Sequence, residues 1–398
     1  MSAEESSPVT GSSYEPESSM RSKLVIVGVA LLFVLGAYAY VGTRDRSLDI
    51  EASALVSQQQ EDGLICCFEW IEHEGEPLLL VITRELEGQY RTVVIRVMEV
   101  EEDGSFNEIN AIGSPFPGML PTNFSVVDET AYIPLEGEEG SGVWAVDLSD
   151  PAWPETVGFT ETADGITRQL SADGDLLAIN HTSQFALVNI SNRHQPEVIS
   201  RIEQPESGVI SLELIDQRLF VNDAVNDEFR IYHLDTSDEP TSEMVLRNPD
   251  GTGEVVFSFG AEDAEDRLNL TAPAGKFLSF RVDGDLVYLA SSDLGVQILD
   301  VSNTESPEVI ARLELPDRAV RLARDGDRLY VLGASEGTYD ELTYTIHTVD
   351  VSNPEAPELL DTIDGFQTEP GIQTLTATGD GRVVLGLFES ILVFDVSE

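Results

Sequence analysis

Six side chains with metal-binding chemistry recur along the chain, each at the end of an apolar segment. Each begins the string Asp-Val-Ser or a close variant of it; they are Asp147, Asn189, Asp235, Asp300, Asp350 and Asp395. Carboxylate and amide oxygens are ligands for Ca²⁺, so a metal site in each repeat is one interpretation. The other is structural, because Asp, Asn and Ser cap turns by bonding nearby backbone N–H groups. We expect these residues to be structural anchors, with no metal bound.

No catalytic constellation is recognisable in the rest of the sequence. The five histidines fall in separate segments and share no motif; they are His73, His181, His194, His233 and His347. The chain contains no GxSxG, HExxH or P-loop string, and no Cys/His spacing resembles a zinc site. The sequence therefore predicts no catalytic residue and no cofactor.

The two cysteines, Cys66 and Cys67, are adjacent. In a regular strand, neighbouring side chains point to opposite faces. A disulfide between them would also distort the peptide, so we expect two free thiols.

The candidate residues are positioned by a repeat. Successive anchors are 42, 46, 65, 50 and 45 residues apart, and an apolar segment at 92–106 adds a degenerate first copy. A second marker, an Asp-Gly or Gly-Asp-Gly turn between apolar segments, precedes several anchors and indicates a β-hairpin. Its glycines are Gly174, Gly284, Gly326 and Gly381. Weaker hairpin patterns fill the remaining copies, which gives seven units.

Each unit contains four expected strands: a hairpin, the strand that ends at the anchor, and an outer strand after an Asn-Pro turn. Both faces of these strands are apolar, which indicates burial on both sides. Units of about 40–45 residues with this pattern are typical of propeller blades. The sequence thus predicts an all-β, seven-bladed β-propeller of four-stranded blades.

Two strings, VQILDVSNTESPEVI (296–310) and IHTVDVSNPEAPELL (346–360), resemble the LVIVD repeat. The resemblance extends over about residues 48–398, and the first and fourth copies depart from it. It implies a surface or exported propeller without a defined activity, and it supplies no catalytic residue that maps onto this chain.

Two segments fall outside the regular pattern. The seventh copy has its hairpin and anchor strand but no outer strand, and we expect residues 47–58 to supply it and to close the propeller, 47–398. The long spacing before Asp300 places an insertion at 246–275. This insertion is either an irregular acidic loop or a binding element that includes a strand at EVVFSF.

The charge balance is strongly acidic, with 73 Asp and Glu against 22 Lys and Arg, a net charge of −51. Such a charge repels itself unless salt screens it. Because only two of the basic residues are lysines, this acidic protein is expected to be halophilic. The same charge argues against a nucleic-acid partner.

The N-terminal region contains an uninterrupted apolar segment at 24–41, long enough to span a bilayer core. We expect a transmembrane helix at 23–42 after a disordered, acidic and Ser-rich tail at 1–22; a cleaved signal peptide is the alternative. The predicted location is the cell membrane, in single-pass form, with the propeller on the extracytoplasmic side.

Two classes of function remain open. The first is a monomeric, non-enzymatic interaction module that binds a protein or a cell-surface glycan. The second is a hydrolase or lactonase-type enzyme with a metal in the central channel. The expected inner strands offer few acids or histidines, which favours the interaction module.

Overall fold

The computed structural model divides the chain into two units, Met1–Asp49 and Ile50–Glu398. The structure describes residues within the second unit only. These are 55–60, 64–87, 90–101, 104–115, 120–121, 123–137, 140–163, 167–181, 184–203, 209–223, 228–235, 245–246, 257–258, 279–291, 295–303, 307–335, 343–366, 374–387 and 390–396. The expected membrane span at 24–41 and the tail at 1–22 therefore lie outside it. In the described part of the chain, no helix is long and apolar enough to cross a membrane.

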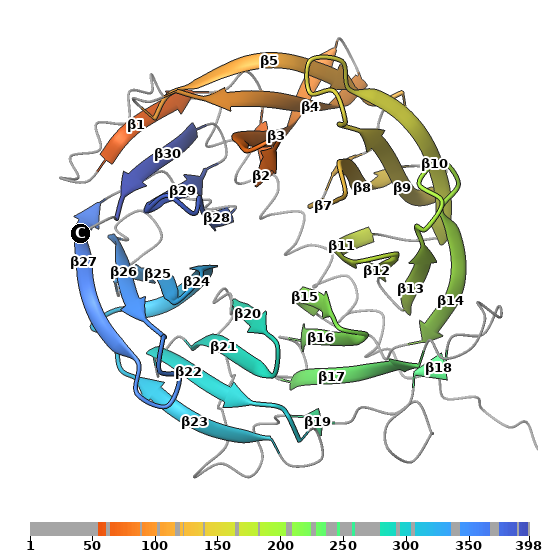
Figure 1. Ribbon diagram of the computed structural model, residues 1–398. Helices are drawn as coiled ribbons and strands as arrows, with labels where there is room; N and C mark the ends of the chain where they lie inside the picture. Colours follow the sequence, from red (N-terminus) through yellow and green to blue (C-terminus); the bar gives the residue numbers. More distant parts are fainter. Residues whose placement is uncertain are drawn as a thin grey trace, which may run out of the picture. The chain divides into compact units, whose positions relative to one another are not determined.

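Seven antiparallel sheets form a ring of seven blades (Figure 1). The innermost strands are β2 (Leu64–His73), β6 (Leu120–Pro121) with β7 (Ser125–Val127), β11 (Thr167–Asp173), β15 (Val209–Ile215), β20 (Phe280–Asp283), β24 (Arg318–Asp325) and β28 (Thr374–Ala377). The second strands are β3 (Glu76–Glu87), β8 (Thr130–Gly137), β12 (Leu176–His181), β16 (Arg218–Asp223), β21 (Leu286–Ser291), β25 (Arg328–Ala334) and β29 (Arg382–Gly386).

The anchor residues end the third strands. These are β4 (Tyr90–Val100), β9 (Gly140–Asp147), β13 (Gln184–Asn189), β17 (Glu228–Asp235), β22 (Gly295–Asp300), β26 (Tyr344–Asp350) and β30 (Ser390–Asp395). The rim strands are β5 (Phe106–Gly113), β10 (Glu155–Ala163), β14 (Glu197–Glu203), β18 (Val245–Leu246) with β19 (Phe257–Ser258), β23 (Glu308–Leu313), β27 (Glu358–Phe366) and β1 (Leu55–Gln60). We number the blades in chain order, so that blade 1 is β2–β5 and blade 7 is β28–β30 with β1. The predicted all-β propeller of seven four-stranded blades is confirmed.

Alternating side chains of each strand pack on opposite neighbours, which explains why both faces are apolar. In β21, Val287 and Leu289 pack against blade 4, whereas Tyr288 and Ala290 pack against blade 6. All four side chains are at most 2% exposed. Because burial of a large apolar side chain contributes about 1.5–3 kcal/mol, packing between blades is a main source of stability.

The ring closes between blade 7 and blade 1. Strand β1 pairs antiparallel with β30, from Leu55 opposite Phe394 to Gln60 opposite Ser390. Val393 of β30 in turn packs in one apolar cluster with Ile65 of blade 1. The rim strand of blade 7 is therefore β1, which precedes blade 1 in the chain. Of the segment 47–58 expected to supply this strand, residues 55–58 belong to β1. Residues 47–54 lie outside the described part of the chain.

A β-bulge interrupts six of the rim strands at one equivalent position. The bulged residues are all apolar: Val56, Ile109, Val157, Ile199, Ile310 and Leu360. A bulge adds one unpaired residue and increases the local twist. Because β1 carries its bulge at the same position, it occupies the full structural role of a rim strand.

Blade 4 contains the expected insertion at 246–275. Its rim position is shared by β18 and β19, both of which pair with β17. Phe257–Ser258 of the EVVFSF string is thus a short strand, and the rest of the insertion lies outside the described residues, apart from Leu246.

The expectation that Cys66 and Cys67 point to opposite faces is wrong. Strand β2 has a bulge at Cys66, since Ile65 pairs with Thr83 and Cys67 with Ile82. A bulge breaks the two-residue alternation of a strand. Both cysteines therefore belong to the same apolar cluster, and both are free thiols.

Candidate interaction site

The anchor residues act on their own turns. A side-chain oxygen of Asp147, Asn189, Asp300 and Asp350 accepts the backbone N–H of the serine two positions later, at 2.8 Å in each case. Hydrogen bonds from the serine hydroxyl and N–H hold the pKa of Asp300 below its usual value. The anchors lie on different blades and are not brought together. For Asp235 and Asp395, the residue two positions later lies outside the described part.

The residue after each of five anchors connects that anchor to the hairpin turn of its own blade. Its N–H donates to a turn carbonyl at 2.7–2.9 Å; the donors are Leu148, Ile190, Val301, Val351 and Val396. In blade 4 the donor is Leu234, which precedes Asp235, so the position equivalent to the other anchors is His233, opposite Arg218. The turn glycines Gly174, Gly284, Gly326 and Gly381 have φ between +52° and +87°, which costs glycine little. The two sequence markers thus form one local unit, a link that neither marker reveals alone.

Polar side chains in or beside the inner strands connect several blades to the next one. Ser171 Oγ accepts the Leu214 N–H at 2.9 Å, and Ser279 Oγ accepts the Leu322 N–H at 3.1 Å. Glu69 is positioned in the same way. Burial raises its pKa to about 8, and a carboxyl oxygen accepts the N–H of Val126 in blade 2.

Charged side chains of the inner strands of blades 4 to 6 lie close enough to influence one another's pKa values. Burial raises the pKa of Glu213 to about 7, although Arg281 and a hydrogen bond from Val282 oppose the rise. Burial, with the charge of Arg281, lowers the pKa of Arg321 to about 10. Sequence reasoning missed these groups because their environment depends on contacts between repeats. In the described residues, no group of three or more His, Cys, Asp or Glu side chains is placed to hold a metal ion.

His347 lies in a relay of hydroxyl groups within blade 6. Thr345 Oγ1 donates to Asp317 Oδ2 at 3.0 Å and therefore accepts from His347 Nε2–H at 3.1 Å. His347 Nδ1 then accepts from Thr362 Oγ1 at 2.9 Å. The imidazole is fully buried, and burial lowers its pKa. This relay joins β26, β27 and the segment before β24, which is a structural role.

The strongest candidate for an interaction site lies on the rim, where blade 1 meets blade 2. Trp153 is 72% exposed and Ile109 is 37% exposed, and both are large apolar side chains. Asn110 Nδ2 of β5 donates to the carbonyl of Ala152, so the residues that follow Ile109 and precede Trp153 are joined. We call Ile109 and Trp153 the rim patch.

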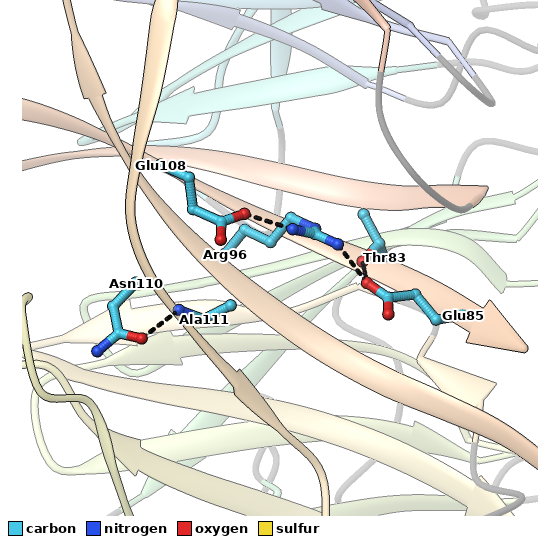
Figure 2. A network of polar contacts seen from close by, with 6 residues as sticks. All are labelled: Thr83, Glu85, Arg96, Glu108, Asn110 and Ala111. Atoms are coloured by element: carbon cyan, nitrogen blue, oxygen red, sulfur yellow. Dashed lines mark hydrogen bonds and ion pairs between the residues drawn. The ribbon is translucent and has the colours of Figure 1, made fainter. Parts of the chain in front are cut away.

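An ion-pair network stabilises the β5 side of the rim patch. Figure 2 shows Arg96 of β4 between Glu85 of β3 and Glu108 of β5, and it donates to both carboxylates. The Asn110 side chain also accepts the N–H of Ala111 at 2.8 Å. These contacts fix β5 across the blade, next to the bulged Ile109.

The turn that carries Trp153 does not require tryptophan. The Trp153 N–H donates to the Asp150 carbonyl at 2.8 Å. The same turn bond forms from Gln195 in blade 3 at 2.9 Å and from Ala356 in blade 6 at 3.0 Å. Each residue is six positions after its anchor. Sequence reasoning missed Trp153, although alignment of the residues after each anchor would have singled it out.

The sequence matches the LVIVD repeat model at residues 30–50 and 274–313. The second range contains the four strands of blade 5, and the first lies outside the described residues. No curated protein matches the chain.

Among solved structures, a chain of "Crystal Structure of Mitotic Checkpoint Complex" aligns with a TM-score of 0.55 and 10% identity, over 89% of this chain and 96% of that one. The structure titled "Crystal structure of WD40 beta propeller domain of Doa1" aligns with a TM-score of 0.52 and 11% identity, over 86% and 96%. Identities this low show the fold alone. The chain is thus a seven-bladed β-propeller that carries the LVIVD repeat.

Proposed function

We propose that this chain is a membrane-anchored, non-enzymatic module that binds a partner protein through the rim patch. The segment at 24–41 would serve as the anchor and place the propeller on the extracytoplasmic side. The single observation that carries the binding proposal is Trp153. Its turn forms equally with glutamine or alanine, so folding gives no reason for an exposed indole at this position.

The chemistry of the rim patch suits a protein partner. Tryptophan is enriched among residues that dominate binding energy, especially when neighbouring contacts exclude water from it. Ile109 adds a second exposed apolar side chain on the adjoining rim strand, and the network around Arg96 keeps that strand rigid, so little entropy is lost on binding. By fold analogy alone, the matched chain in the mitotic checkpoint structure is also part of an assembly.

The buried groups with shifted pKa values favour binding over catalysis. Glu69 and Glu213 each accept a main-chain N–H of the next blade, and both imidazole nitrogens of His347 have hydroxyl partners. A catalytic acid or base must be able to reach a substrate. These groups instead bond one part of the propeller to another.

The test uses the immobilised full-length protein and an envelope extract of the cells that produce it, in molar salt. We expect a retained protein that is lost with Trp153→Gln, which reproduces the turn of blade 3. Leu360→Gln is the matched control, because Leu360 is a rim-strand bulge residue, like Ile109, and is 43% exposed. Equal retention by the wild type and Trp153→Gln would refute the proposal. Retention that survives protease but not periodate would indicate a glycan instead.

Membrane placement needs a separate measurement. Protease added to intact cells should digest the propeller, and a chain without residues 1–46 should be released into the soluble fraction. Protection of the propeller in intact cells would contradict the extracytoplasmic location.

A further inference from the structure

The two cysteine thiols lie side by side, which adjacent residues of a regular strand could not do. The bulge at Cys66 turns its side chain to the side of Cys67, and the Cys67 thiol donates to Cys66 Sγ at an Sγ–Sγ distance of 3.2 Å. Cys67 is 7% exposed, whereas Cys66 is half-buried. A reagent can therefore reach the pair from the side of Cys66.

The Sγ–Sγ distance indicates which kind of sulfur-binding ion both thiols could hold together. If both sulfurs bond one centre at about 2.3 Å, the usual length for a metal–thiolate bond, a 3.2 Å separation subtends an angle of about 90°. That angle suits a pyramidal trivalent centre. It is narrower than the tetrahedral angle of zinc and far from a linear two-coordinate ion.

A trivalent hydroxide also supplies its own proton acceptors. Its oxygens take up the two thiol protons when the two sulfur bonds form, so both sulfurs of the pair can bind one centre.

We propose that Cys66 and Cys67 form a dithiol site for a soft trivalent centre of the arsenite class. Two As–S bonds form and two As–O bonds break. The two thiol protons leave with the oxygens as water, and no electron is transferred. Soft thiolate sulfur is the preferred partner of such a centre.

The test uses phenylarsine oxide with the full-length protein, after reduction and removal of the reductant. We expect one equivalent to bind, with a mass increase equal to the reagent less one water. Excess glutathione, a monothiol, should leave the adduct intact, whereas dithiothreitol should remove it. Cys66→Ser and Cys67→Ser each leave one thiol, and each should lose the adduct in glutathione.

If a serine variant fails to fold, the glutathione challenge of the wild-type adduct still tests the proposal. Loss of the wild-type adduct in glutathione would refute the chelate, as would equal retention by both single variants after their melting curves show that they are folded. Failure of the folded, reduced wild type to bind the reagent would refute it as well.

Discussion

Strand β1 is expected to contribute more to stability than any other part of the chain before β2. It forms five residue pairs with β30, and an antiparallel ladder supplies on average one main-chain hydrogen bond per pair. At about 1 kcal/mol of net stability per bond, the loss of β1 costs about 5 kcal/mol. That loss is comparable to the whole stability of many domains, about 5–15 kcal/mol. It would also leave β30, whose Phe394 packs on Phe366 at 4.9 Å between ring centroids, as an open edge.

The assay compares two truncated chains by urea unfolding at constant high salt. A chain without residues 1–54 keeps β1, and a chain without residues 1–60 loses it. We expect a much lower midpoint, or no cooperative transition, for the second. Equal midpoints would show that β1 is a dispensable linker and would refute the closure argument.

Proline substitutions give a finer version of the same test. Proline removes a backbone donor, and donors alternate in direction along an edge strand. Of Ser57→Pro and Gln58→Pro, only one should remove a bond to β30, and that variant should unfold at a lower urea concentration than the other. Two equal and small effects would contradict the observed pairing.

Three other predictions concern pH, the buried relay and salt. Glu69 has a pKa raised to about 8 by burial. Between pH 5 and 8 the unfolded chain therefore ionises at this residue while the native chain stays neutral, so native stability falls as pH rises. Glu69→Gln should gain stability relative to the wild type from pH 5 to pH 9 in thermal melts, and a constant difference would contradict this. Thr362→Val removes the donor to His347 and should cost about 1–3 kcal/mol in urea unfolding at pH 7, whereas Thr362→Ser should not; equal stability would argue against the relay. The melting temperature should rise between about 0.1 and 2 M salt, because salt screens a net charge of −51; an unchanged value would contradict a halophilic protein.

The repeat made the architecture predictable from sequence, because its signals are local. An Asp-Gly turn specifies a hairpin through the φ preference of glycine, as at Gly284 and Gly326. The anchor specifies the following turn through a bond only two residues long. Seven such units leave few alternatives to a propeller, and a missing rim strand points to a partner elsewhere in the chain.

The remaining features depend on contacts that no local pattern contains. A bulge moves one residue out of the ladder without a turn signal, so Cys66 was assigned to the wrong face. The environment of Glu69 depends on Val126 in the next blade. These contacts join residues of different repeats, and the sequence of one repeat cannot specify them.

The distinction between features of the repeat and features of a single blade indicates where function should be sought in a repeat protein. Positions that recur in several blades have their partners within the fold, as the anchors and turn glycines do. A residue that departs from its equivalents without a structural need requires another explanation. Trp153 stands where other blades have Gln195 and Ala356 and the same turn bond forms. The inner strands of blades 3, 4 and 6 also carry a bulge, at residues 168, 210 and 320, but only the bulge of β2 brings two thiols together. Both departures lie in blades 1 and 2, so this part of the ring is where binding partners and reactive ligands should be tested first.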